Sequence, residues 1–268
     1  MKKLALILLA ALLSLSLFSC VAEEEGTSNI NDYVAPNYTH KLTDQQGGGT
    51  ITFTEGHADS AIIASYTGKS TPHAIEIPDT ISESKRDVTG IGDEAFYQLT
   101  TIKSIKLPDS VTFIGKYAFA GCTALEEIVI PASVTYIDEG AFHGCTALKK
   151  VTFAGTDITS IGKFAFHDCT ALTEITLPDG LESIGDFAFG NCAALTAFAA
   201  PSTLKTIGEL AFYGCSGLNA DGAVVLSSSI EKIGDFAFSG VNKNYISAPA
   251  GSYAAEYVSK MAEPETED

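Results

Sequence analysis

The sequence has no tryptophan and a single arginine, Arg86, among its 268 residues. Only 16 Lys and Arg side chains are set against 33 Asp and Glu side chains, which gives a formal net charge of −17. A protein that binds phosphates needs clustered cations, so this composition argues against a nucleic-acid partner. The same shortage argues against electrostatic attachment to an anionic membrane surface.

Signatures of common enzymes are also missing. The sequence contains no Gly-x-Ser-x-Gly, no His-Glu-x-x-His and no phosphate-binding loop. Asp and Glu are abundant, but nothing in their spacing places two of them in a cleft for acid–base chemistry. We therefore expect no enzyme activity and no cofactor, and we predict neither catalytic nor metal-binding residues.

Apolar residues make up 46% of the chain, which is enough for a buried core. The apolar run at residues 4–18 follows Lys2 and Lys3 and precedes Ser19. A short basic region, an apolar core of about 15 residues and a small residue before the cut are typical of a secretory signal. We predict a signal peptide at residues 1–19. The alternative is an amino-terminal anchor helix, for which the run is short, since a spanning helix needs about 20 residues.

The end of this segment, Leu-Phe-Ser-Cys at residues 17–20, resembles a bacterial lipobox. The resemblance implies lipidation of Cys20 and a lipid anchor in the bacterial outer membrane. Residues 20–37 contain Glu23-Glu24-Glu25 and then small polar residues, so we predict a flexible acidic tether. Acidic residues behind a lipidated cysteine resemble surface-export signals of some lipoproteins, which implies exposure at the cell surface.

A pattern of about 23 residues repeats seven times through the rest of the chain. An Ile lies four residues before each Ala-Phe pair, and a Cys lies three residues after the Phe in the five central copies. A unit this short cannot bury its own apolar residues, so the repeats are expected to stack around one continuous core. The Ala-Phe pairs lie at 95–96, 118–119, 141–142, 165–166, 188–189, 211–212 and 237–238.

Each repeat reads approximately Leu-x-x-Ile-x-Leu-Pro-x-x-Val-x-x-Ile-Gly-x-x-Ala-Phe-x-x-Cys. In the clearest copy Ile128 and Ile130 alternate with Val129, which is typical of a strand. Pro131 then ends the strand because it cannot donate to a ladder. The second half of the repeat is too short for a full helix, and we predict short strands or 3₁₀ turns there.

These columns resemble the BspA-like class of bacterial leucine-rich-repeat surface proteins over residues 71 to 241. The resemblance implies an α/β-class, right-handed leucine-rich-repeat solenoid that is β-rich, with the Leu-x-x-Ile-x-Leu strands lining a concave sheet. It also implies adhesion to host extracellular proteins or to other cells. We expect a β-hairpin cap at 38–70, the solenoid at 71–245, and a short helical cap with an acidic tail at 246–268.

The concave sheet is the predicted protein-binding surface, because solenoid curvature creates an extended surface there. The alternative contact surfaces are the loops and edges of the array. The outward positions are mixed in charge in the first half of the array and small or apolar in the second. The predicted protein-binding residues are Lys106, Glu127, Val129, Lys150, Thr152, Glu174 and Thr176, and the outward positions continue through Ala197, Ala199, Ala223 and Val225.

The five repeat cysteines are predicted to form a buried, reduced column. Their odd number and the absence of Cys-x-x-Cys spacing argue against a disulfide set or a metal site. His143 and His167 follow Ala-Phe in adjacent repeats, with Asp168 beside them, and such a group could hold Zn²⁺. Because the same column tolerates many residue types, we predict an exposed edge instead, with the metal site as the alternative. The other residues of that column are Tyr97, Ala120, Gly190, Tyr213 and Ser239.

Taken together, the sequence and the resemblance predict an exported, lipid-anchored solenoid that binds protein and acts as an adhesin. The predicted partners are host extracellular-matrix or surface proteins, or other cells. The alternative is a structural spacer or scaffold of the cell envelope that has no specific host ligand.

Residues inserted into the repeat pattern predict two loops, at 82–87 and 219–222. Alternating apolar residues predict a hairpin at 50–66.

Overall fold

The computed structural model describes residues 38–41, 48–56, 60–68, 70–71, 73–81, 85–220 and 222–261. The predicted signal peptide, Cys20, the whole predicted tether and the acidic end of the chain lie outside these residues. Among the helices that are described, none combines the length and the apolar character needed to cross a membrane.

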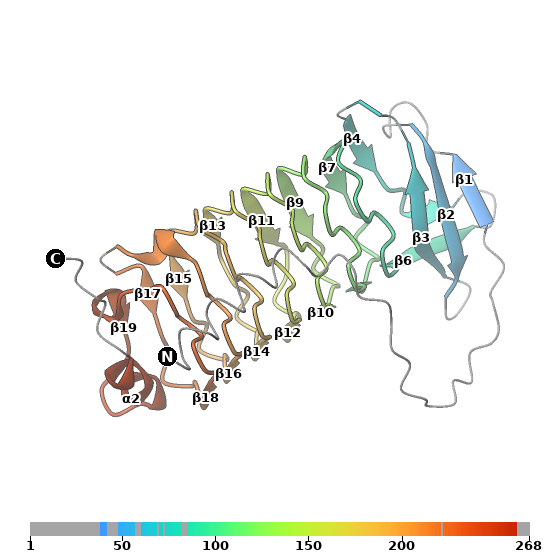
Figure 1. Ribbon diagram of the computed structural model, residues 1–268. Coiled ribbons are helices and arrows are strands. Elements are labelled where there is room, and N and C mark those ends of the chain that lie inside the picture. The colour runs from blue at the N-terminus through green and yellow to red at the C-terminus, as the bar shows by residue number, and fades with distance from the viewer. Residues whose placement is uncertain are drawn as a thin grey trace, which may run out of the picture. The chain divides into compact units, whose positions relative to one another are not determined.

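The repeats form a β-solenoid of about eight turns with little helix (Figure 1). Every complete turn supplies a very short strand at its Ile-Gly segment, and these strands pair in parallel, each with the same segment of the next turn. They form most of an eleven-stranded sheet. Its solenoid strands are β6 (Arg86–Ile91), β8 (Phe113–Ile114), β10 (Tyr136–Ile137), β12 (Ser160–Ile161), β14 (Ser183–Ile184), β16 (Thr206–Ile207) and β18 (Lys232–Ile233).

The Leu-x-x-Ile-x-Leu segments form the opposite wall of the solenoid. In the first turns they make a parallel five-stranded sheet with the order β13-β11-β9-β7-β4. The apolar residue at the centre of each strand faces the core and its neighbours face outward, as the period of two predicts. The strands are β4 (His73–Glu76), β7 (Ile102–Lys106), β9 (Glu127–Ile130), β11 (Lys150–Phe153) and β13 (Glu174–Ile175).

This wall is divided into two sheets, whereas the resemblance implies a single concave sheet. β15 (Phe198–Ala199), β17 (Val224–Val225) and β19 (Ile246–Ser247) form a separate three-stranded parallel sheet. The break coincides with Phe198, which occupies the core column that holds Ile175 in the preceding turn. Its ring centroid lies 4.4 Å from that of Phe212, so this turn packs a bulky ring where the others pack a β-branched side chain.

The Ala-Phe segments complete each turn without a helix, as the sequence predicts. Backbone N–H groups donate from turn to turn, for example from Phe119 to the Ala141 carbonyl at 2.7 Å and from Phe142 to the Ala165 carbonyl at 2.8 Å. Two residues per turn adopt left-handed conformations, such as Phe164 (φ 57°) and Asp168 (φ 59°). These two reversals let a short segment turn the chain while its amides still pair with the next turn.

The core is a column of stacked aromatic rings. Eight fully buried phenylalanines occur in the described residues after position 90, and the Phe of each Ala-Phe pair stacks on the same residue of the next turn. Leu, Ile and Val side chains of the two walls close around this column. The apolar columns of the repeat thus form one continuous core, as a stacked array requires.

Each end of the solenoid is closed by a different structure. At the amino-terminal end β1 (Tyr38–Lys41), β2 (Thr50–Glu55) and β3 (Ala61–Thr67) pair antiparallel, and β3 then pairs in parallel with β6. At the carboxyl-terminal end lies helix α2 (Tyr253–Lys260). It is capped by the Ser252 hydroxyl oxygen, which accepts a hydrogen bond from the Ala255 amide. Short 3₁₀ turns lie at Ser216–Leu218 and Lys243–Tyr245.

The predicted loop at 82–87 is partly wrong. β5 (Thr80–Ile81) pairs antiparallel with β6, and Arg86 and Asp87 belong to that pairing. The guanidinium of Arg86 also lies 2.7 Å from the carboxylate of Glu55 on β2. Arg86 and Asp87 therefore extend β6, and residues 82–84 of the predicted loop lie outside the described residues.

Candidate binding surface

All seven residues predicted to bind protein are exposed, and all lie on the outer face of the five-stranded sheet or directly after it. We call this face the charged sheet face. The structure brings the side chains together because parallel pairing places equivalent residues of successive repeats beside each other. The spacing of 23 or 24 residues along the chain therefore becomes one strand spacing across the sheet.

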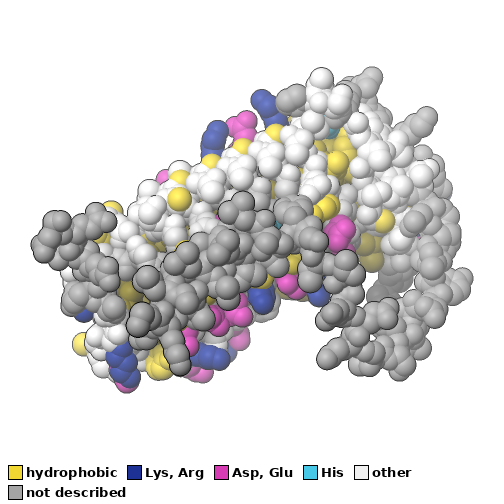
Figure 2. All heavy atoms as spheres, in the orientation of Figure 1, with side chains coloured by type: hydrophobic (Ala, Val, Ile, Leu, Met, Phe, Trp, Pro, Cys, Tyr) yellow, Lys and Arg dark blue, Asp and Glu magenta, His cyan; other side chains and the backbone are white. Residues whose placement is uncertain are grey.

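Charges alternate along one row of this face. Lys150 is in register with Glu127 on one side and with Glu174 on the other. Opposite charges on neighbouring strands attract, but pairs this exposed contribute only about 0–1 kcal/mol each to stability. Figure 2 shows basic and acidic side chains interspersed along the upper edge of the solenoid.

The neighbouring row is less charged. It begins with Lys106, whose Nζ lies 2.5 Å from the Glu76 carboxylate on β4, and this contact raises the pKa of the Lys106 ammonium. Val129 follows one turn later with 55% of its surface exposed, and it is in register with Thr152. The row therefore presents an apolar side chain between polar ones.

The sequence reasoning missed a further charged group at the border of this face. Glu126 accepts a hydrogen bond from Lys149 Nζ at 3.0 Å, and Lys103 Nζ lies 4.0 Å away on its other side. The hydrogen bond from Lys149 lowers the pKa of the Glu126 carboxyl. The signal was present, because Lys103, Glu126 and Lys149 occupy one column of the repeat.

The apolar continuation of the surface is only partly as predicted. Ala197, Ala199 and Val225 are exposed on the three-stranded sheet and beside it. Ala223 is buried, with 4% of its surface exposed, so its assignment as an outward position is wrong. It lies between the Asn219–Gly222 insertion and β17, and both Ala223 and Val224 are buried, so the alternation of a strand is not kept there.

The cysteine column is confirmed as buried and reduced. Each of the five thiols is fully buried, and none of the described cysteines is in a disulfide. Each Sγ donates to the carbonyl of the Phe in the preceding repeat, for example Cys145 to Phe119 at 3.2 Å and Cys215 to Phe189 at 3.0 Å. Burial raises the pKa of Cys122 to about 12, so these thiols stay protonated.

The prediction of an exposed edge is wrong for His167 and only partly right for His143. His167 has only 7% of its surface exposed, and His143 is half-buried. The residues that share their column in other turns include Ala120 and Gly190, which are themselves buried. The column is thus mixed in burial, since Tyr97 is exposed whereas Ala120, His167 and Gly190 are buried.

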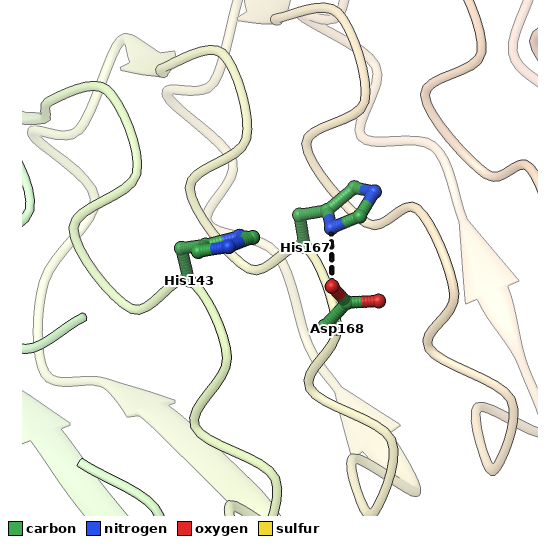
Figure 3. A group of neighbouring side chains, drawn as sticks. All are labelled: His143, His167 and Asp168. Atoms are coloured by element: carbon green, nitrogen blue, oxygen red, sulfur yellow. Dashed lines mark ion pairs between the residues drawn. The ribbon is translucent and has the colours of Figure 1, made fainter. Parts of the chain in front are cut away.

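The two histidines and Asp168 form a compact group (Figure 3). The ring centroids of His143 and His167 are 5.3 Å apart, and His167 Nδ1 lies 3.0 Å from Asp168 Oδ2. That contact lacks the direction of a hydrogen bond, and the buried Nδ1 atoms of both histidines have no hydrogen-bond partner. Asn191 Nδ2 donates to the other oxygen of Asp168 at 2.8 Å.

Comparison with known protein families identifies the repeat. A family model described as the BspA type leucine-rich repeat region matches in six copies, over residues 74–157 and 154–258. No curated protein matches the sequence.

Solved structures from several bacteria share the fold. A leucine-rich repeat protein of T. pallidum is 26% identical with a TM-score of 0.68, covering 84% of this chain and 98% of its own. A leucine-rich cell surface protein of Faecalibacterium prausnitzii is 29% identical with a TM-score of 0.62, covering 78% of this chain and 53% of its own. A leucine-rich repeat protein of Bacteroides ovatus is 29% identical with a TM-score of 0.59, covering 72% of this chain and 56% of its own. The chain thus spans about half the length of the last two.

Proposed function

This chain belongs to the BspA-type leucine-rich repeat family, and on that basis we propose that it is an exported, lipid-anchored adhesin that binds other proteins through the charged sheet face. The family is one of protein-interaction repeat proteins. Adhesion, the protein partner and the lipid anchor are what we propose for this chain.

The observation that carries the proposal is the charged sheet face itself. Lys150 between Glu127 and Glu174 gives a partner an alternating pattern of charge to match, which favours specificity and fast association. Val129 adds an exposed apolar side chain within the same surface. Strand pairing holds the backbone that carries these residues, on both sides for Glu127, Val129 and Lys150 and on one side for Glu174. A partner would therefore meet an ordered surface, and little ordering entropy would be lost.

Export and anchoring are supported by the amino-terminal sequence. A basic start, an apolar run and Cys20 in a lipobox-like sequence favour a lipoprotein. The similar protein from Faecalibacterium prausnitzii is described as a cell surface protein. We propose the same location for this chain, with the solenoid held outside the bacterial outer membrane.

The second candidate is a structural component of the envelope that has no host ligand. Protease treatment of intact cells, with lysed cells as the control, separates the two locations. Cleavage of the solenoid on intact cells is the expected result. Protection until lysis would place the solenoid in the periplasm and contradict the adhesin.

Binding is tested with variants that leave the core untouched. Saturable binding of the purified protein to immobilised extracellular-matrix proteins should weaken at least tenfold in Lys150→Glu and in Val129→Asp. The controls are Lys232→Glu and Tyr136→Asp, which introduce the same acidic residues at exposed positions of the eleven-stranded sheet. Equal loss in the controls would contradict the assignment to the charged sheet face, and no saturable binding at all would favour the spacer.

A further inference from the structure

We propose that His143, His167 and Asp168 form a binding site for a divalent transition-metal ion of the Zn²⁺ type, which joins two adjacent turns of the solenoid. The inference is independent of the proposed function, because it concerns a different wall of the solenoid. We call these three residues the histidine site.

The donors are of the right kind and within reach of one ion. Each residue offers one ligand atom, and the three atoms lie within 4.8 Å of one another. Imidazole nitrogens and carboxylate oxygens bind Zn²⁺ at about 2.0–2.2 Å, so the three atoms need to close by only about 1 Å or slightly more. Figure 3 shows the His143 ring extending from its turn toward the other two side chains.

The strongest indication is that two buried histidine nitrogens make no hydrogen bond, although that of His167 lies 3.0 Å from Asp168 Oδ2. The Nδ1 atoms of His143 and His167 are enclosed and make no hydrogen bond. Leaving a buried polar atom unpaired costs about 1–3 kcal/mol, so native proteins rarely keep two together. His73 shows the ordinary arrangement, since its Nε2 lies 2.9 Å from Tyr66 Oη and its Nδ1 lies 2.7 Å from the Thr71 carbonyl.

Surrounding residues hold the ligands in place. The ring of Phe164 meets the His167 ring edge-on at 5.5 Å. Gly190 lies so close to His167 that a Cβ there would be 2.7 Å from its Cδ2. The Asn191 amide donates to Asp168 Oδ1 and leaves Oδ2 facing the histidines. Partners of this second layer orient the ligands of metal sites.

The protonation states suit metal binding. Burial, together with the neighbouring His167, lowers the pKa of His143 and keeps its imidazole neutral. Burial alone would raise the pKa of Asp168, but the contacts with His167 and Asn191 outweigh it and hold the carboxyl below its usual range. Metal ligation requires a neutral imidazole and an ionised carboxylate, and the directions of the pKa shifts of His143 and Asp168 agree with that requirement.

The site would act as a clamp between turns. His143 belongs to one repeat and His167 with Asp168 to the next, so an ion held by all three resists their separation. Three protein ligands leave a position for water. The Asp168 side chain is 28% exposed and provides a route of entry from solvent.

The test is calorimetric titration of ZnCl₂ into the untagged, metal-free full chain. We expect one equivalent to bind with a micromolar or lower Kd. At a Zn²⁺ concentration of about 100 Kd, the Tm should rise by about 5 °C or more. Co²⁺ should give visible absorption bands without thiolate charge transfer, which would separate this site from the cysteines.

Variants assign the binding to these residues. His143→Ser and His167→Ser introduce a residue that the same column already holds at Ser239, and each should weaken binding at least tenfold. Asp168→Asn should do the same, and its left-handed backbone is compatible with Asn, since Asn191 occupies the next turn with φ 59°. Asp168→Asn keeps the side-chain volume. It therefore remains a usable test if a histidine variant does not fold in the metal-free protein prepared with EDTA.

His73→Ala is the matched control and should bind Zn²⁺ like the wild-type protein. Three results would overturn the proposal: no heat of binding, a millimolar Kd, or unchanged affinity in the His143→Ser/His167→Ser double variant.

Discussion

The rings of Phe142 and Phe166 lie 5.2 Å apart between their centroids and within 3° of parallel. Both side chains are fully buried, and each is the Phe of an Ala-Phe pair in successive turns. The same relationship connects Phe119 to Phe142 at 5.2 Å. One ring therefore contacts two others, and removing it breaks the core on both sides.

Phe142→Ala should lower the free energy of unfolding by about 3–5 kcal/mol, because it removes a buried aromatic side chain and leaves a cavity. Urea unfolding followed by circular dichroism measures the change. His143→Ala is the control at the adjacent residue, and we expect a smaller loss because His143 is only half-buried. If the histidine variant proved the less stable of the two, the assignment of the core column would be incorrect.

The five repeat thiols should be unreactive in the native protein and all titratable in denaturant. They are fully buried, and thiolates rather than thiols react with disulfide reagents. The measurement is thiol titration of residues 21–268, with and without guanidinium chloride. Recovery of only one free thiol in denaturant would indicate two disulfides and contradict the reduced column.

Stability should fall at alkaline pH. In the unfolded chain a thiol ionises near pH 8.5, whereas burial raises the pKa of Cys122 and of Cys215 to about 12. Above about pH 8.5 the folded state thus binds more protons than the unfolded state. The contribution of these thiols to the free energy of unfolding is therefore fully present below that pH and declines toward pH 12. Each thiol contributes up to about 1.4 kcal/mol per pH unit.

Urea unfolding between pH 8 and 11 measures this decline. In Cys169→Ala the free energy of unfolding should decline less steeply with pH, because one titrating group is removed. The free energy of unfolding of this variant at neutral pH should be lower than that of the wild-type protein. An unchanged slope in this variant would show that the thiols do not cause the alkaline loss.

Gly208→Ala should cost about 1–3 kcal/mol through overpacking. A Cβ at this position would lie 2.5 Å from the carbonyl carbon of Gly185 in the preceding turn. Asp138 occupies the same column of the repeat and already carries a side chain, whose Oδ1 accepts from the Glu139 amide at 2.7 Å. Asp138→Ala is thus the control, and thermal unfolding should show a smaller loss for it than for Gly208→Ala.

The repeat columns predicted the fold well because a solenoid converts sequence period directly into spatial contact. Once Ile128 and Val151 are assigned to one column, their strands must be neighbours, and β9 and β11 pair in that register. The outward orientation of Glu127 and Val129 follows from the same alternation. The exposed residues of the charged sheet face could thus be identified from the sequence.

The burial of His143 and His167 could not be predicted in this way. Their column lies between the two left-handed residues of each turn, where neither the period of a strand nor that of a helix gives the side-chain direction. The variety of residues in this column suggested exposure to solvent, but one of them, Ala120, is buried. The packing of Phe164 and Gly190 around His167 depends on three-dimensional contacts between turns.

The ends of the solenoid have a consequence for its length. Every turn offers the next the same hydrogen-bonding edge, as the layers of a cross-β fibril do, and such an edge can template further chains. The antiparallel strands β1, β2 and β3 close one end in a geometry that a parallel turn cannot extend, and α2 lies against β18 at the other. These two structures act like chain terminators in a polymerisation, because they cover the two ends of the array at which a further turn would have to pair.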